Sequence, residues 1–191
     1  MPRRSVYLAA VALAAGVVAS AQQGAVDKSG YQFLTEQDID LLVESSTTQL
    51  LGAPMLGGGD KRLAMLNLRN KTKDHIDGLS ILERIGTQLI RSQTITVVER
   101  QQLVDIAREQ ALSESLSKRS DGIQAGKLAG ADYLLEGQIT EISKKAGTKK
   151  QIYYALNLRM IDVRTSEVVF ATEAEVKKKS QRSLTDFLGV K

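Results

Sequence analysis

Apolar and polar residues alternate along three consecutive segments in the C-terminal third of the chain. These segments are 131–142, 151–162 and 167–176. In the second segment, Leu156, Leu158 and Met160 alternate with Asn157 and Arg159. A period of two is typical of strands that bury one face, so the pattern predicts three half-buried strands.

The connections between these segments are short. Residues 144–150 join the first two strands, and residues 163–166 join the last two. Gly147 lies in the first connection, where a tight hairpin needs a residue that tolerates positive φ. Connections of this length join antiparallel neighbours. We therefore expect an antiparallel meander whose apolar face is covered by upstream helices.

Upstream of the meander, helical and strand patterns alternate. The expected elements are a helix over 35–51, a strand over 62–69, a helix over 77–92, a strand over 95–99, a helix over 100–115 and a helix over 121–129. Thr35 and Asp38 have the spacing of a capping box, and Asp77 can cap the next helix. Gly130 is placed to end the last helix as its C′ residue.

These patterns predict the α/β (α+β) class, with a small mixed sheet flanked by helices and ending in the three-stranded antiparallel meander. The expected core comprises Leu63, Leu66, Leu82, Ile85, Leu89, Val97, Leu103, Leu135, Ile139, Leu156, Leu158 and Val169. Other helix residues expected to point inward are Ile39, Leu42, Val43, Ser46, Leu50, Leu79, Ile90, Ile106, Ala107 and Ala111.

The N-terminus has the pattern of a secretory signal. Two arginines precede an apolar run over 6–18, and Ala19-Ser20-Ala21 has the small-x-small form that signal peptidase cleaves. An uncleaved anchor is the alternative. We expect a signal peptide over 1–21, a short leader over 22–30, one domain over 31–179 and a polar tail over 180–191.

Composition narrows the function. The chain has no Cys, which excludes disulfides, thiolate metal sites and a lipidated Cys. Aromatic residues make up 4% and Trp is absent, which argues against a platform for stacking nucleic-acid bases. The net charge is +4, but it is unevenly distributed. From Lys144 onward there are eleven Lys and Arg residues and five Asp and Glu residues, whereas residues 22–143 contain thirteen Lys and Arg and seventeen Asp and Glu. Such a basic end is either a solvated face or a surface for an acidic partner.

The residues that catalysis requires do not come together. His75 is the single histidine, and no G-x-S-x-G motif accompanies it. The segment 74–77 could hold a metal, but it is more simply a loop that enters a helix. The glycines at 57–59 lack the Lys-Ser/Thr ending of a phosphate loop. We therefore expect a binding module without cofactor, metal, nucleic acid or small-molecule substrate, and not an enzyme.

Four segments in order resemble the LpoB family of penicillin-binding protein activators, within the wider CsgG-like group. They are 70–77, 121–137, 144–154 and 160–165, and the resemblance runs from about residue 31 to residue 179. It implies a fold like the N-terminal domain of TolB and a non-catalytic role. Family members bind a docking domain on a bifunctional penicillin-binding protein and stimulate its glycan polymerisation and crosslinking.

Two features differ from that family. LpoB-type activators are outer-membrane lipoproteins with a long tether, whereas this chain has no Cys. About ten residues separate Ala21 from Tyr31, and they span about 35 Å when extended. We expect a freely soluble periplasmic protein, or one associated peripherally with the envelope. The alternative function is a CsgG-like accessory of an envelope secretion or fibre-assembly system.

The basic hairpin is the first candidate for the partner site. The candidate residues are Lys144, Lys145, Lys149, Lys150, Tyr153, Tyr154 and Arg159. Their charges favour an acidic partner, and one of the two tyrosines is expected to add an aromatic contact at the surface. The alternative is that these lysines only prevent a sheet edge from pairing with other chains. The second candidate site is the loop with Asn70, Thr72, Asp74 and His75.

Overall fold

The computed structural model describes residues 33–57, 60–112, 116, 118–146 and 149–181. Of residues 145, 146, 149, 150 and 179–181, it describes the backbone alone. The expected signal segment 1–21, the leader 22–30 and all but two residues of the tail 180–191 lie outside the described residues.

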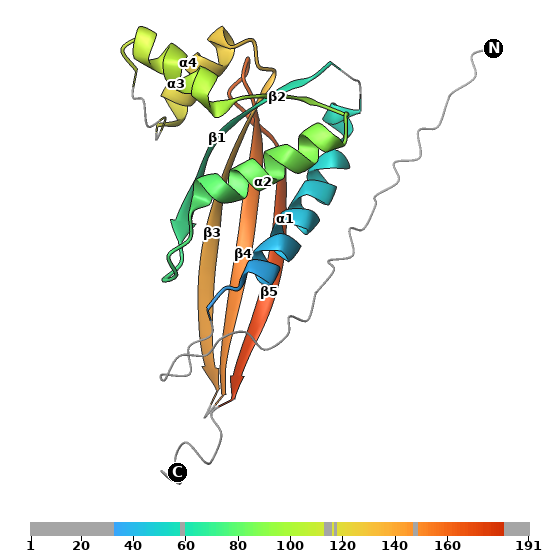
Figure 1. Ribbon diagram of the computed structural model, residues 1–191, viewed down its shortest axis with the longest axis vertical. Helices are drawn as coiled ribbons and strands as arrows, with labels where there is room; N and C mark the ends of the chain where they lie inside the picture. Colours follow the sequence, from blue (N-terminus) through green and yellow to red (C-terminus); the bar gives the residue numbers. More distant parts are fainter. Residues whose placement is uncertain (1–32, 58–59, 113–115, 117, 147–148, 182–191) are drawn as a thin grey trace, which may run out of the picture.

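Five strands form one mixed sheet in the order β2-β1-β3-β4-β5. They are β1 (Arg62–Lys71), β2 (Thr96–Val98), β3 (Tyr133–Ala146), β4 (Lys149–Asp162) and β5 (Val168–Gln181). β1 runs parallel to β2 and β3, while β3, β4 and β5 are antiparallel neighbours. The expected mixed sheet with its C-terminal meander is therefore confirmed, and Figure 1 shows the three long strands side by side.

The hairpin between β3 and β4 is longer than expected. The sequence predicted strands over 131–142 and 151–162 with 144–150 as the connection, but β3 continues to Ala146 and β4 begins at Lys149. The backbone of Lys145 pairs with that of Lys150 across the hairpin. Lysine is unfavourable in strands but does not end them as proline does, so the ladder extends through this basic stretch.

The helix α1 (Glu36–Leu51) begins at the predicted capping box. The side chain of Thr35 accepts from the N–H of Asp38, and the Asp38 carboxylate accepts from the N–H of Thr35 at 2.8 Å. Leu42, Val43 and Leu50 are buried, as the helical spacing indicated. A short 3₁₀ turn, η1 (Pro54–Leu56), follows the helix.

The helix α2 (Gly78–Arg91) is capped by Asp77, whose carboxylate accepts from the N–H of Leu79 at 2.9 Å. Two of its residues expected to be inward are exposed, Leu79 at 43% and Ile90 at 58%, while Ile81 is buried. The buried stripe follows i, i+1, i+4 and i+8 from Ile81, and Leu79 and Ile90 fall beside that stripe near the two ends of the helix.

The next two helices are α3 (Arg100–Glu109) and α4 (Arg119–Leu128). α3 ends earlier than the expected residue 115, because Ala111 adopts a φ of 53° and the chain leaves the helix there. Ala111 is exposed rather than inward. After α4, Gly130 has a φ of 68°, the left-handed C′ geometry that the sequence indicated.

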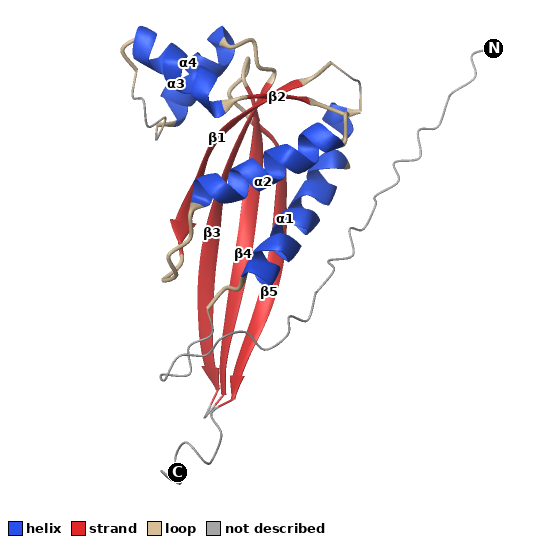
Figure 2. Cartoon of the chain, in the orientation of Figure 1, coloured by secondary structure: helices blue, strands red, loops and turns tan. Residues whose placement is uncertain are grey.

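The sheet carries an apolar core on each face. Figure 2 shows α1 and α2 crossing the long strands, with α3 and α4 together near the end of the sheet that holds β2. The core under α1 and α2 includes Leu63, Leu135 and Leu158. The core under α3 and α4 includes Leu66 and Leu134. Of the twelve predicted core residues, ten are buried, whereas Val97 and Val169 are partly exposed and pack against the first core.

Candidate functional site

Beyond α3 and α4, one face of the sheet is covered by none of the described helices. We call this surface the open face. Its outward side chains, placed by strand register and alternation, are Asn67, Arg69, Lys71, Glu136, Gln138, Thr140, Ile142, Lys144, Gln151, Tyr153, Ala155, Asn157, Arg159, Ala171, Glu173, Glu175 and Lys177. Such alternation with a polar outer face is usual in antiparallel sheets, but here the face is unusually long because β3, β4 and β5 have 14 residues each.

Three of the predicted partner residues lie on the open face. They are Lys144, Tyr153 and Arg159, with Lys144 and Arg159 exposed and Tyr153 partly exposed. Tyr153 and Arg159 are six residues apart on β4, which corresponds to about 20 Å along an antiparallel strand. The predicted residues Lys145, Lys149 and Lys150 continue the same hairpin, and their side chains are outside the described part of the structure.

Tyr153 sits between two lysines. The Nζ atoms of Lys144 and Lys177 lie 5.4 Å and 5.0 Å from the centre of its ring, within the range of cation–π attraction. Its hydroxyl donates to the Oε1 atom of Gln151 at 2.8 Å. Directly opposite on β3 is Ile142, which is 57% exposed. The far end of the open face therefore presents an apolar and aromatic pair ringed by positive charge.

Tyr154, the other tyrosine predicted as a partner-site residue, points to the opposite face of the sheet. Its side chain is fully buried, and its hydroxyl donates to the Oδ2 atom of Asp74 at 2.8 Å. Adjacent strand residues point to opposite faces of a sheet, so the exposure of Tyr153 excludes that of Tyr154. Of the two predicted tyrosines, Tyr153 therefore lies on the open face and Tyr154 does not.

The second predicted site, the loop after β1, is held by its own hydrogen bonds. The Nδ2 atom of Asn70 donates to the carbonyl of Asp74 at 2.8 Å, and its Oδ1 atom accepts from the N–H of Thr72 at 2.9 Å. The Oδ2 atom of Asp74 also accepts from the N–H of Leu34 at 2.9 Å. The side chains of Asn70, Thr72 and Asp74 therefore have hydrogen bonds that hold the loop in its conformation, whereas the side chain of His75 is exposed.

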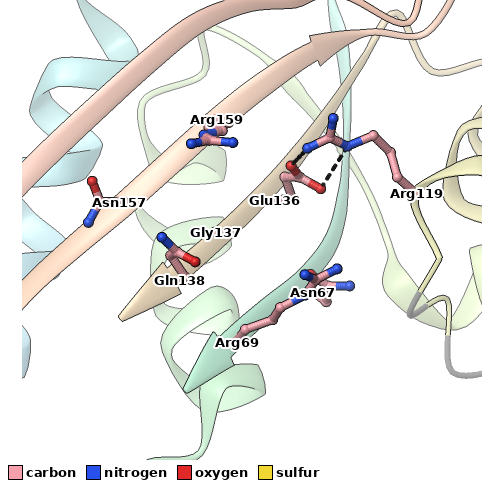
Figure 3. Close-up of a pocket in the computed structure, with 8 residues that line it drawn as sticks. All are labelled: Asn67, Arg69, Arg119, Glu136, Gly137, Gln138, Asn157 and Arg159. Atoms are coloured by element: carbon pink, nitrogen blue, oxygen red, sulfur yellow. Dashed lines mark hydrogen bonds and ion pairs between the residues drawn. The ribbon is translucent and has the colours of Figure 1, made fainter. Parts of the chain in front are cut away.

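At the other end of the open face, charged and amide side chains surround a hollow of about 100 Å³. Its lining residues are Asn67, Arg69, Arg119, Glu136, Gly137, Gln138, Asn157 and Arg159 (Figure 3). Of these lining residues, only Arg159 was predicted from the sequence as a partner-site residue. The outward positions on β3 and β4 could have been obtained from the strand alternation, but Arg119 comes from α4 and needs the tertiary structure.

Arg119 connects α4 to the sheet. Its Nε atom donates to the Oε2 atom of Glu136 at 3.3 Å, and its Nη2 atom forms an ion pair with Oε1 (Figure 3). The hydrogen bonds to Glu136 raise the pKa of Arg119, against a smaller opposing effect of burial. The Glu136 side chain is 12% exposed, so this pair is sheltered from solvent on the carboxylate side.

No group of three or more His, Asp or Glu side chains suited to a metal ion occurs among the described residues. None of the described helices is both long enough and apolar enough to span a membrane.

The fold is a helix-flanked α+β domain whose sheet has one open face. A family profile described as "Peptidoglycan-synthase activator LpoB" matches residues 38–176. The chain therefore belongs to the LpoB family of peptidoglycan-synthase activators, a family of activators rather than catalysts.

Solved structures share the fold. The C-terminal domain of LpoB from Salmonella enterica has 22% sequence identity and a TM-score of 0.58, covering 76% of this chain and 99% of its own. The corresponding Escherichia coli domain has 21% identity and a TM-score of 0.59, covering 72% and 96%. The NMR structure of E. coli LpoB has 18% identity and a TM-score of 0.54, covering 95% and 91%. The search of curated proteins gave no match.

Proposed function

We propose that this protein is exported to the periplasm, docks on a bifunctional penicillin-binding protein and stimulates its glycan polymerisation and crosslinking. Membership in a family of peptidoglycan-synthase activators supports the activity. The open face supports the mode of action, because an activator without catalytic groups of its own has to act through a surface contact.

The observation that carries the docking site is the pair Ile142 and Tyr153. An exposed isoleucine opposite a tyrosine, flanked by Lys144 and Lys177, combines apolar area with charge. Tyrosine is enriched among the few residues that dominate binding energy at interfaces, and surrounding polar groups exclude water from such anchors. The basic rim would speed the encounter with an acidic partner surface.

The test is a polymerisation assay with a purified bifunctional penicillin-binding protein and its lipid-linked glycan precursor. Adding the exported protein should raise the rate of glycan synthesis several-fold. A variant with Ile142→Ser and Tyr153→Ser should bind the synthase more weakly, by about tenfold or more if the pair is a hot spot.

The matched control is Leu79→Ser with Ile90→Ser. Both residues are exposed apolar residues on α2, against the other face of the sheet. The control should bind and stimulate as the parent does. The proposed function is wrong if the parent neither binds the synthase nor changes its rate, and the proposed site is wrong if both variants lose binding equally.

A further inference from the structure

The hollow at the α4 end of the open face has an excess of positive charge. Three guanidinium groups line it, from Arg69, Arg119 and Arg159, together with the single carboxylate of Glu136. That carboxylate is already engaged by Arg119. Guanidinium groups that line one hollow favour the binding of an anion there.

Arg159 is the guanidinium available to such an anion. Its side chain is exposed, and none of the hydrogen bonds and ion pairs between described residues involves its guanidinium. It lies directly across from Glu136 in the β3–β4 pairing, while Asn157 and Gln138 form the next outward pair along the same strands. Figure 3 shows these side chains around one space, with the two amides beside the arginine. Amide N–H groups and a guanidinium fork are both donors to a carboxylate.

The size of the hollow limits its occupant. A volume of about 100 Å³ is well below the 300–1,000 Å³ typical of small-molecule sites. It has room for one carboxylate-sized group with a few waters. The carboxylate of Glu136 in the hollow disfavours a dianion such as phosphate more than a monoanion such as a carboxylate, because two negative charges rather than one would lie close to it.

The surroundings indicate that this carboxylate belongs to a protein. The hollow is continuous with the rest of the open face, and the Ile142 and Tyr153 pair lies about 20 Å away along the strands. A surface of this length with an apolar anchor at one end matches the scale of a protein interface rather than of a free metabolite.

We propose that the hollow lined by Arg159, Arg119, Gln138 and Asn157 is a seat for one Asp or Glu side chain of the partner synthase. The proposal rests on the proposed function, since the synthase supplies the carboxylate. Arg159 binds the carboxylate through its guanidinium fork, the two amides fix its orientation, and Glu136 holds Arg119 in position beside it. The contact sets the register of the partner along the open face.

The first experiment measures the affinity of the exported protein for the purified synthase in parallel with Arg159→Gln and Arg159→Lys. Arg159→Gln should weaken binding about tenfold, with unchanged thermal stability. Arg159→Lys keeps the charge but loses the fork, so it should recover only part of the affinity. The matched control is Arg91→Gln, at the exposed end of α2 on the other side of the molecule, which should bind as the parent does.

Other results of this experiment would overturn the proposal or part of it. Binding by Arg159→Gln within twofold of the parent overturns the seat, and full recovery by Arg159→Lys overturns the bidentate contact. If Arg159→Gln is unstable, Gln138→Ala and Asn157→Ala replace it, and unchanged affinity in both overturns the proposal. A parent that does not bind the synthase overturns the proposed function.

The second experiment tests the hollow without the synthase. The side-chain amide resonances of Gln138 and Asn157 are followed by NMR during titration with sodium acetate or with inorganic phosphate at constant ionic strength. Acetate should shift both resonances in the parent and less in Arg159→Gln. No response to acetate, or a stronger response to phosphate, overturns the carboxylate seat whatever the synthase assay shows.

Discussion

Asp38, in the first turn of α1, forms an ion pair with Lys178 of β5, and their side chains are 2% and 1% exposed. The same carboxylate accepts from the N–H of Thr35 at 2.8 Å. The Asp38 carboxylate therefore both takes part in capping the N-terminus of α1 and links this helix to β5, the edge strand of the sheet. Because both charges are buried, either one left alone would lack solvation.

Replacing Lys178 by Met should lower the free energy of unfolding by about 3–5 kcal/mol, the usual cost of leaving a buried charge without its partner. Chemical denaturation measures this change. The matched control is Lys177→Met, on the adjacent position but on the open face, where the loss of a cation–π contact costs about 1 kcal/mol or less. Equal losses in the two variants would contradict a structural role for the buried pair.

Tyr154→Phe should destabilise the protein by about 1–2 kcal/mol, since it removes a buried hydrogen bond to a carboxylate. Tyr153→Phe removes a hydroxyl from the open face and should cost less than about 0.5 kcal/mol. Denaturation midpoints of both variants provide the comparison. A larger cost for Tyr153→Phe would mean that the two tyrosines have been assigned to the wrong faces.

Local signals in the sequence predicted much of the fold. Thr35 and Asp38 mark the start of α1, Asp77 caps α2, and Gly130 ends the last helix in the left-handed conformation. Each of these features depends on residues within a few positions of one another, so tertiary structure adds little to them. The meander was predicted for the same reason, because its connections are short.

The candidate site was harder to predict because alternation does not reveal which face the helices cover. The pattern around Tyr153 and Tyr154 shows that they point apart, but either could be the outward one. Lys178 follows the inward positions Ala174 and Val176 in the same period, yet its burial requires Asp38 from a distant helix. The hollow likewise depends on Arg119, whose position is set by the packing of α4.

Leu158→Ala tests the core beneath α1 and α2. Leu158 is fully buried, and its truncation should cost about 2–5 kcal/mol. Its side chain fills the space beside Gly137, where an added Cβ would come within 2.6 Å of the Leu158 Cδ2 atom. A change below about 1 kcal/mol in chemical denaturation would place Leu158 outside the core.

Asp162, which ends β4 and begins the turn after it, should make the free energy of unfolding depend on pH in the acidic range. Burial raises the pKa of Asp162, but the N–H groups of Thr165 and Arg164, at 3.1 Å and 2.7 Å from its Oδ1 atom, outweigh burial and hold the pKa below its ordinary value. This carboxylate stabilises the fold above its unfolded pKa of about 3.9, and the stabilisation is lost as pH falls through the lower folded pKa.

Asp162→Asn should therefore reduce stability near neutral pH and flatten the loss of stability on acidification. Urea denaturation at a series of pH values from neutral to acidic measures both effects. Asp60→Asn, at an exposed position, is the control and should follow the parent curve. An unchanged pH dependence in Asp162→Asn would exclude the turn as a source of acid sensitivity.

The basic hairpin provides the last prediction. The backbone of Lys145 pairs with that of Lys150, so two lysines occupy directly opposite positions in the strand register. Opposed like charges destabilise a strand pair, so reversing Lys145 and Lys149 to Glu together should leave the melting temperature unchanged or slightly raised. If these lysines attract an acidic synthase surface, the same double variant should capture the penicillin-binding protein more weakly. The difference from the parent should grow at low salt, where screening is weaker. If the double variant captures the synthase as well as the parent does, the lysines would serve only to keep the hairpin from pairing with other chains. The loop from Asn70 to Asp77 would then become the next docking candidate.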